Sequence, residues 1–184
     1  RPPVERTGHR LMAARRPRRG TIRAPGYRIL GPLHRSNHFD AFDAWDEHRW
    51  CRCILKTPRP DRIDDARTGR RLLREGRRLK RLRPPHIVSV VEVITDPRPI
   101  VVMETLTGET VGHLIESSDG GLDDVSAAWM GLHLCSALAH LHANDLLHLD
   151  LKPSNVVAEN GRAIVIDLSS AARPGRLRAG GGTW

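Results

Sequence analysis

The sequence contains little cysteine, few aromatic residues and no long apolar run. Its 184 residues include three cysteines, too few for a scaffold held by disulfides, and 4% aromatic residues, which predicts a mostly aliphatic core. No stretch approaches the roughly 18 apolar residues that a bilayer-spanning helix needs, and no signal peptide is visible. These absences exclude a disulfide-rich secreted domain and predict a cytoplasmic chain without a membrane segment.

The cysteines leave two interpretations. Cys51 and Cys53 stand two apart in an expected strand, so their side chains point the same way and cannot easily bridge each other. His48 lies near both in the sequence, which makes a metal site the alternative. Ordinary reduced thiols are the simpler interpretation, because free cysteine is common in protein interiors.

Positive charge is the strongest compositional bias. Lysine and arginine number 30 against 21 aspartate and glutamate residues, which gives a net charge of +9. The basic residues are spread over most of the chain, so we expect no specific nucleic-acid partner. Residues 1–24 are rich in arginine and have almost no apolar periodicity, which predicts a flexible basic tail. Nucleic-acid binding through this tail is the alternative.

The strongest chemical signal is a polar segment late in the chain. Asp150 can accept a proton from a hydroxyl group, and Lys152 can neutralise charge on a phosphoryl group. Asn155 and Asp167 offer oxygen ligands that suit Mg²⁺. An Asn-Gly pair between them, at residues 160–161, predicts a hairpin that holds the two ligands close together. These groups indicate phosphoryl transfer; the alternative is a polar turn between two buried strands.

The spacing of this segment resembles the catalytic loop of protein kinases, H-R-D-L-K-P-x-N followed by D-F-G. Here the residues are His148-Leu149-Asp150-Leu151-Lys152-Pro153-Ser154-Asn155 and then Asp167-Leu168-Ser169. The form is that of the serine/threonine branch, so the resemblance implies ATP and Mg²⁺ as cofactors and a protein substrate with serine or threonine hydroxyls. It implies that Asp150 deprotonates the hydroxyl, Lys152 stabilises the transferred charge, and Asn155 and Asp167 bind the metal. Leu149 replaces the arginine, which argues against control by a phosphorylated activation loop.

The region before this loop resembles the phosphate-binding N-terminal lobe of the same family. From Leu33 the chain follows the framework L-G-x-G-x-x-G-x-V-Y-x-A-x-D, but the three glycine positions carry His34, Ser36 and Phe39. Glycine is used there because backbone N–H groups must approach the phosphates. We therefore expect side chains at these positions to lift or reshape the loop.

Two charged residues match the family's phosphate-positioning pair. The alternating segment 50–56 resembles V-A-I-K, whose lysine, here Lys56, holds the α- and β-phosphates. Apolar spacing predicts a helix over residues 67–83, and its one acidic residue, Glu75, matches the glutamate that pairs with that lysine. The alternative for Glu75 is a surface acid balanced by neighbouring arginines.

The resemblance also implies an adenine site. Ile54 falls where the family has alanine and Ala41 where it has valine, so the two changes roughly conserve volume. Strands over residues 87–94 and 100–103 lead to a hinge, with Met103 in the gatekeeper position. The nucleotide-binding residues implied by the register are Leu33, Ala41, Ile54, Lys56, Glu75, Met103, Glu104 and Leu106.

The resemblance implies an α+β, two-lobed, protein-kinase-like fold over residues 25–184. Residues 25–105 would form an antiparallel five-stranded N-lobe with one helix. Residues 106–184 would form an incomplete, mainly helical C-lobe, with helices at 110–117 and 125–143, that ends in the activation segment. We expect a bacterial member of the eukaryotic-type (Hanks-type) serine/threonine kinases, incomplete in this chain and with an apolar C-lobe face left exposed.

Two functions from different classes stay open. The retained polar residues favour a serine/threonine protein kinase that transfers the γ-phosphoryl group of ATP to protein hydroxyls. The alternative is a pseudokinase, a binding or scaffold module, which the degenerate glycine-rich loop favours. Six polar residues support the first function: Lys56, Glu75, Asp150, Lys152, Asn155 and Asp167.

Overall fold

The computed structural model describes residues 22–117 and 121–175 of the chain. The expected basic tail therefore lies outside the described residues over 1–21, as does the end of the expected activation segment over 176–184. The last three residues assigned to the tail are described, and they form a short strand, β1 (Ile22–Ala24), that pairs with β2.

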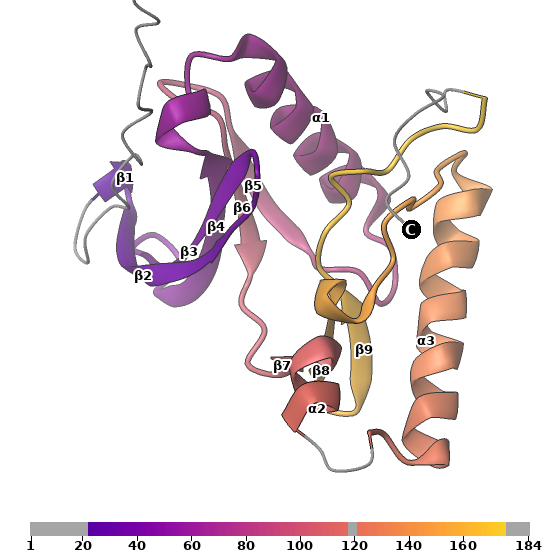
Figure 1. Ribbon diagram of the computed structural model, residues 1–184. Coiled ribbons are helices and arrows are strands. Elements are labelled where there is room, and N and C mark those ends of the chain that lie inside the picture. Colours follow the sequence, from indigo (N-terminus) through magenta and orange to yellow (C-terminus); the bar gives the residue numbers. More distant parts are fainter. Residues whose placement is uncertain (1–21, 118–120, 176–184) are drawn as a thin grey trace, which may run out of the picture.

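The first lobe is an antiparallel sheet covered by one helix (Figure 1). The five expected strands are present, and β1 adds a short sixth strand at the outer edge. The helix α1 (Ala66–Leu82) packs on the strands that lie farthest from β1 in the sheet. In sheet order after β1, the strands are β2 (Tyr27–Arg35), β3 (Phe39–Asp46), β4 (Cys51–Pro58), β6 (Ile100–Glu104) and β5 (Val90–Ile94).

Local interactions fix where α1 begins and how closely it packs. Asp65 caps the helix, because its carboxylate accepts hydrogen bonds from the Arg67 backbone N–H and the Thr68 hydroxyl. Gly76 lies so close to the sheet that a Cβ atom there would be 2.5 Å from the Val101 side chain. Glycine at this position therefore lets α1 approach β6.

The second lobe begins with a strand and a short helix, β7 (Glu109–Thr110) and α2 (Val111–Ser117). The long helix α3 (Asp124–Ala143) follows and packs against the hairpin of β8 (Val156–Glu159) and β9 (Arg162–Val165). Asn160 and Gly161 form the predicted turn, both with positive φ. Two 3₁₀ helices complete the described elements, η1 (Pro60–Arg62) and η2 (Pro153–Asn155).

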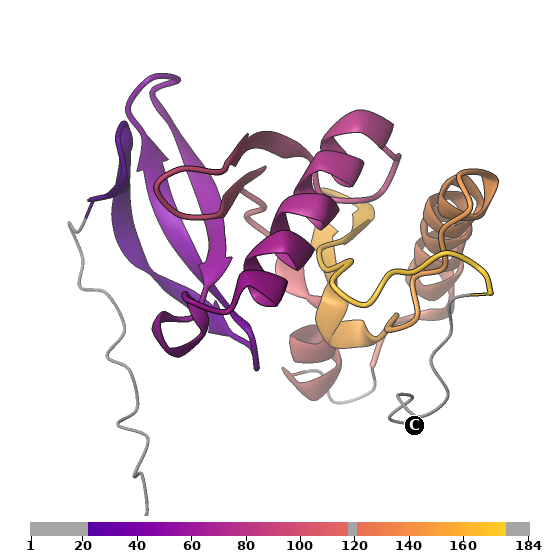
Figure 2. The same cartoon turned by 90° about the horizontal axis from the view of Figure 1, so that it is seen from above.

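One hydrophobic core joins the two lobes. It combines Leu72 and Leu79 of α1 with Leu141 of α3 and Leu168 after β9. In Figure 2, α1 lies between the sheet of the first lobe and α3. The Val88 N–H donates to the Val165 carbonyl at 2.9 Å, so the segment after α1 is bonded to β9 rather than to the first sheet. The expected strand over 87–94 accordingly starts at Val90.

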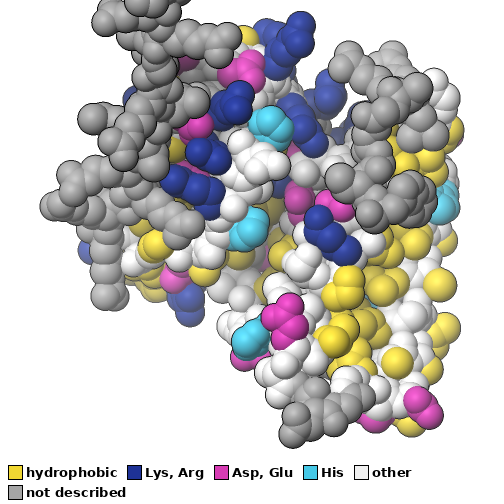
Figure 3. Space-filling view, viewed as in Figure 1, with side chains coloured by type: hydrophobic (Ala, Val, Ile, Leu, Met, Phe, Trp, Pro, Cys, Tyr) yellow, Lys and Arg dark blue, Asp and Glu magenta, His cyan; other side chains and the backbone are white. Residues whose placement is uncertain are grey.

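The outer face of α3 is apolar and exposed. Val125 is 67% exposed, Trp129 59% and Leu132 60%, whereas Ala137 and Leu141 are buried toward β9. Figure 3 shows hydrophobic side chains gathered over this helix. This confirms the expected exposed C-lobe face. Over the two described ranges, no helix combines the length and the apolar character needed to cross a bilayer.

The three cysteines are free thiols. Burial raises the pKa of the Cys53 thiol to about 12, which leaves it protonated and unreactive at neutral pH. Among the described residues, no cluster of three or more His, Cys, Asp or Glu side chains could hold a metal ion, so the metal alternative for Cys51, Cys53 and His48 is wrong.

Candidate active site

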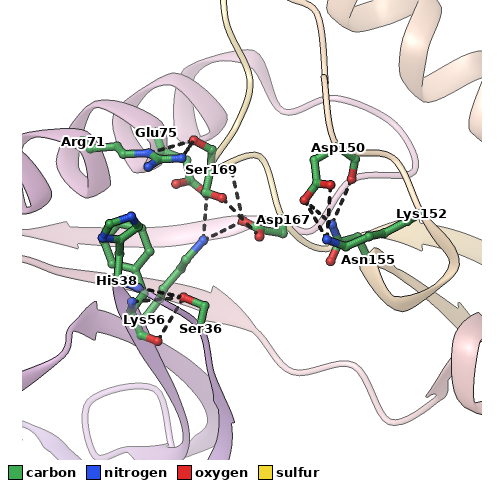
Figure 4. Close-up of polar contacts among 11 residues, drawn as sticks. Ser36, His38, Lys56, Arg71, Glu75, Asp150, Lys152, Asn155, Asp167 and Ser169 are labelled. Atoms are coloured by element: carbon green, nitrogen blue, oxygen red, sulfur yellow. Dashed lines mark hydrogen bonds and ion pairs between the residues drawn. The ribbon is translucent and has the colours of Figure 1, made fainter. Parts of the chain in front are cut away.

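Three charged side chains from distant parts of the chain meet between the lobes (Figure 4). The Lys56 Nζ atom on β4 lies 3.0 Å from Glu75 Oε1 on α1 and 2.9 Å from Asp167 Oδ1 after β9. The Lys56 and Glu75 side chains are 11% and 10% exposed, so Glu75 is not a surface acid. The structure therefore brings together three of the residues that the sequence assigns to phosphates and metal.

The electrostatics of this cluster favour charged forms. Burial disfavours the Lys56 ammonium, but the Glu75 and Asp167 carboxylates outweigh burial and hold the pKa of Lys56 above its ordinary value. Burial likewise opposes ionisation of Asp167, but Lys56 and the hydrogen bonds from Ser169 lower the pKa of Asp167 below its ordinary value. Both groups are charged at neutral pH, as phosphate and metal binding require.

The turn after Asp167 is tied to α1 by two residues that the sequence analysis missed. Ser169 donates its backbone N–H to Asp167 Oδ1 at 3.0 Å and its hydroxyl to Asp167 Oδ2 at 3.2 Å. Arg71 donates from Nε to the Ser169 carbonyl at 2.9 Å, and its Nη2 donates to the same oxygen. Arg71 precedes Glu75 by four residues, so both lie on the same face of α1. This four-residue spacing from Glu75 is the sequence feature that could have identified Arg71.

The catalytic-loop residues form a second polar group close by (Figure 4). Lys152 Nζ lies 3.0 Å from Asp150 Oδ2, and Asn155 Nδ2 donates to the Asp150 carbonyl at 2.9 Å and to Asp150 Oδ2 at 3.2 Å. Asp150 is thus oriented from two sides. The Asn155 Oδ1 atom has no hydrogen-bond partner among the described residues, which leaves it available as a ligand.

His148 holds the start of this loop. Its side chain is buried, and its Nδ1 atom accepts the Asp150 backbone N–H at 3.2 Å. Burial lowers the pKa of His148, which keeps Nδ1 as an acceptor. Leu149 between them has φ of 64°, a left-handed conformation that costs about 1–3 kcal/mol for a residue other than glycine. The turn buries His148 while it leaves Asp150 partly exposed.

The register of the sheet gathers the expected adenine-side residues on the face that carries Lys56. Ala41 pairs with Lys56 across β3 and β4, and Ile54 pairs with Met103 across β4 and β6. Paired residues share a face of the sheet, as do residues two apart in one strand. Met103 is buried, and Ile54 and Leu106 pack against the same core.

Leu33 and Glu104 lie in less enclosed positions. Leu33 is 53% exposed at a bulge of β2, between the paired residues Pro32 and His34. Glu104 begins the hinge, where its backbone N–H donates to the Ser89 carbonyl and its side chain accepts the Ser89 N–H at 2.7 Å. The Glu104 N–H and side chain are therefore used within the first lobe.

Sequence comparison agrees with this geometry. Residues 39–176 match the protein kinase domain family, a span that covers most of the chain and all of the polar residues described above. The chain belongs to the protein kinase family. Its fold is accordingly the two-lobed kinase fold, with the antiparallel N-lobe sheet, one N-lobe helix and an incomplete C-lobe.

Relatives within the protein kinase family come from plants and bacteria. The chain is 36% identical over 114 residues to the CBL-interacting protein kinase 4 of Oryza sativa, covering 60% of this chain and 25% of that protein. It is 30% identical over 153 residues to a probable serine/threonine-protein kinase of Streptomyces coelicolor, covering 79% and 23%. It is 29% identical over 117 residues to the serine/threonine-protein kinase PknB of Mycobacterium leprae, covering 61% and 19%. The chain thus spans about a quarter or less of the length of these kinases.

The donor atoms fit the Mg²⁺ that the kinase family uses. The Ile166 N–H donates to the Asn155 carbonyl at 3.0 Å, which ties together the two segments that carry the expected ligands. Asp167 contributes a carboxylate and Asn155 an unpartnered amide oxygen. Mg²⁺ is usually held by one or two carboxylates together with substrate phosphates and water, so this small donor set is sufficient.

Two of the side chains that replace family glycines, Ser36 and Phe39, make specific contacts in the phosphate loop. The Ser36 hydroxyl oxygen accepts the backbone N–H of Phe39 at 3.1 Å and of His38 at 3.4 Å. Phe39 is 4% exposed, and the centroid of its ring lies 5.3 Å from Lys56 Nζ. Ser36 therefore holds the turn closed, and Phe39 fills the space beside the lysine; that these side chains lift or reshape the loop relative to the family stays a prediction.

Proposed function

We propose that this chain is part of an ATP-dependent serine/threonine protein kinase of the eukaryotic type found in bacteria. The observation that supports the proposal best is the convergence of Lys56, Glu75 and Asp167, since these residues come from three distant segments and form one charged cluster. The activity belongs to the whole protein, of which this chain carries the nucleotide lobe and the catalytic loop. A cytoplasmic location and the lack of a specific nucleic-acid partner stay predictions from the sequence.

Binding of ATP would use both lobes. The adenine ring would lie against the sheet face of Ala41, Ile54 and Met103, with Leu33 and the hinge residues Glu104 and Leu106 at its borders. Lys56, held by Glu75, would contact the α- and β-phosphates as a point charge. Asn155 and Asp167 would hold Mg²⁺, which neutralises charge on the phosphates when it is bound.

Transfer would depend on the catalytic loop. Asp150 would orient the serine or threonine hydroxyl of the substrate and accept its proton as the oxygen attacks the γ-phosphorus, while the bond from the γ-phosphorus to the bridging oxygen breaks and ADP leaves. Lys152, 3.0 Å from Asp150, would stabilise the charge on the transferred group. Asn155 would keep Asp150 in place through its amide nitrogen while its oxygen faces the metal.

A pseudokinase is the second candidate, and the loop geometry favours it. The N–H groups of His38 and Phe39, which in the kinase pattern face the phosphates, are directed to the Ser36 hydroxyl. A protein of this kind would keep the fold and the nucleotide site as a scaffold, without transfer.

A transfer assay with radiolabelled ATP separates the two candidates. The full-length protein is incubated with Mg²⁺ and a general serine/threonine substrate, beside an Asp150→Asn control that keeps the shape of the side chain. If the protein is a kinase, we expect label in the substrate and a rate of transfer at least about 100-fold lower in the control. Transfer no higher than in the control, with ATP binding intact in both proteins, would establish the scaffold function instead.

A further inference from the structure

We propose that Phe39 is a specificity-determining residue of the nucleotide site. Its ring lies beside the Lys56 ammonium, where the phosphates of ATP would have to reach it. We therefore infer that the resting site recognises the adenosine part of a nucleotide and gains little affinity from the phosphates until the ring is displaced. The inference rests on the proposed nucleotide binding, but not on phosphoryl transfer.

Strand alternation aims Phe39 into the site. Phe39 and Ala41 are two residues apart in β3, so both side chains project from the same face of the sheet. Ala41 pairs directly with Lys56, and this face therefore carries the lysine. Phe39 is 4% exposed and belongs to the core that contains Leu72 of α1. The ring is thus buried on the face of the sheet that carries the lysine, in a core that α1 helps to form.

The interaction between the ring and the ammonium is attractive in its own right. With the ring centroid 5.3 Å from Nζ, the pair has the geometry of a cation–π contact. A nucleotide phosphate would compete with the ring for the same ammonium. The adenine-side residues Ile54 and Met103 lie farther along the sheet and pair with each other, so the ring does not displace them.

The turn that carries Phe39 is closed by its own hydrogen bonds. The Ser36 hydroxyl accepts two backbone N–H groups, and the Ser36 N–H donates to the Phe39 carbonyl at 2.9 Å. Arg59 donates its backbone N–H to the His38 carbonyl at 3.0 Å. Asp40, next to Phe39, is buried and bonded to Arg35 through two contacts of 2.6 and 2.8 Å. The backbone N–H groups of Ser36, His38 and Phe39 are therefore satisfied without a phosphate.

Binding measurements with adenosine, ADP and Mg²⁺-ATP test the proposal. In the full-length wild type, we expect ATP to bind within about threefold of adenosine; in Phe39→Gly, we expect ATP to bind at least about tenfold tighter than adenosine. Asn37→Gly is the matched control, because it also introduces a glycine into this turn but changes an exposed residue that is not at a family glycine position. It should behave as the wild type. If ATP binds more tightly than adenosine by the same factor in wild type and in Phe39→Gly, the proposal is wrong.

A second measurement follows the Phe39 ring itself in the full-length wild type. This chain contributes two phenylalanines, and after labelling with fluorophenylalanine the Phe39 signal is identified by its loss in Phe39→Gly; Phe42, buried in the separate core on the other sheet face, is an internal reference. Saturating Mg²⁺-ATP should move the Phe39 signal and leave that of Phe42, whereas adenosine should move neither. Saturation by ATP with an unmoved Phe39 signal would overturn the proposal, as would the absence of ATP binding in every variant.

The outcomes separate this proposal from the proposed kinase activity. Displacement of Phe39 by ATP without any transfer to protein would support the specificity role and reject the kinase function. Transfer by the wild type with Phe39 in its resting position would support the kinase function and reject the specificity role.

Discussion

The proposed nucleotide site has two sides that differ in how far they keep the kinase pattern. We call Lys56, Glu75 and Asp167 the floor and the loop from Ser36 to Phe39 the roof. Below, Lys56, Glu75 and Asp167 keep the charges and distances that phosphate and metal chemistry require. Above, three backbone N–H groups of the loop from Ser36 to Phe39 are bonded within the loop, and Phe39 places an aromatic ring beside the lysine. The charged side chains of a kinase site can therefore be retained while access to them changes, because the charges and the loop that covers them belong to different segments of the chain.

Removal of the central cation should have the largest effect. In Lys56→Met, Glu75 and Asp167 would face each other without a counter-charge, which we expect to lower the free energy of unfolding by about 3 kcal/mol. Lys152→Met is the matched control, because that lysine is 51% exposed and its pair with Asp150 contributes under about 1 kcal/mol. Urea unfolding of both variants measures the difference. Equal losses would show that the buried cluster does not hold the lobes together.

Arg71 should matter next, because it connects the floor to α1. In Arg71→Ala, the Ser169 carbonyl loses a charged donor, and we expect a loss of about 2 kcal/mol in stability together with reduced nucleotide binding. Arg71→Lys should recover part of the loss, since one donor remains. The neighbouring exposed Arg70, changed to alanine, should stay within about 0.5 kcal/mol of wild type. A similar loss in Arg70→Ala would contradict the assignment.

Ser36→Ala, in the roof, should lower the stability by a smaller amount. The change removes the hydroxyl that accepts the His38 and Phe39 N–H groups, and we expect a cost of about 1 kcal/mol, as for other capping residues. Amide hydrogen exchange at residues 38 and 39 should quicken, while exchange in α1 stays unchanged. Unaltered exchange at the turn would mean that Ser36 does not hold it closed.

A pH dependence should give the smallest effect and bears on the catalytic loop. An ordinary histidine titrates near pH 6.5, and burial lowers the pKa of His148 below that value in the folded protein. The unfolded chain therefore binds the proton first, so the stability due to neutral His148 is complete above about pH 6.5 and is lost as the pH falls through the folded pKa. Burial also lowers the pKa of His86, which adds in the same direction.

The contribution of His148 is isolated by comparison with His148→Asn, which has no titrating group there. The melting temperature, measured from pH 8 to pH 5, should fall more steeply for wild type than for the variant. Parallel declines would assign the dependence to His86 or to other groups.

Much of the fold could be predicted from local patterns. Alternation indicated the strand over residues 50–56, the spacing of leucines predicted α1 within one residue at each end, and Asn160-Gly161 marked the hairpin, whereas the five-stranded sheet was implied by the resemblance to the kinase family. The short strand β1 was missed because Ile22–Ala24 has only three residues, too few for alternation to indicate a strand, and its pairing with β2 depends on tertiary contact. The start of β5 was placed too early because His86 and Val88 hydrogen-bond to Val165 of β9 on either side of Ile87. No local pattern reveals this partner, which is about 80 residues away in the sequence.

The site could be predicted only in part for a similar reason. Residue type identified Asp167 as a metal ligand, and the resemblance to the kinase family identified Lys56 and Glu75, because the family's chemistry requires these side chains. The roles of Ser36, Phe39 and Arg71 depend on which backbone groups they reach, and that follows from the shape of a turn and the position of a helix. A serine and a phenylalanine in a loop carry no such information by themselves.

Transfer of the γ-phosphoryl group in wild type and Asp167→Asn tests the central claim, that the convergent charges form a working nucleotide site, most directly. The substitution keeps the size of the side chain but removes the charge that faces Lys56 and the metal. With full-length protein, radiolabelled Mg²⁺-ATP and a folded variant, the account predicts transfer by the wild type and a loss of at least about 100-fold in Asp167→Asn. Equal transfer by the two proteins would contradict it.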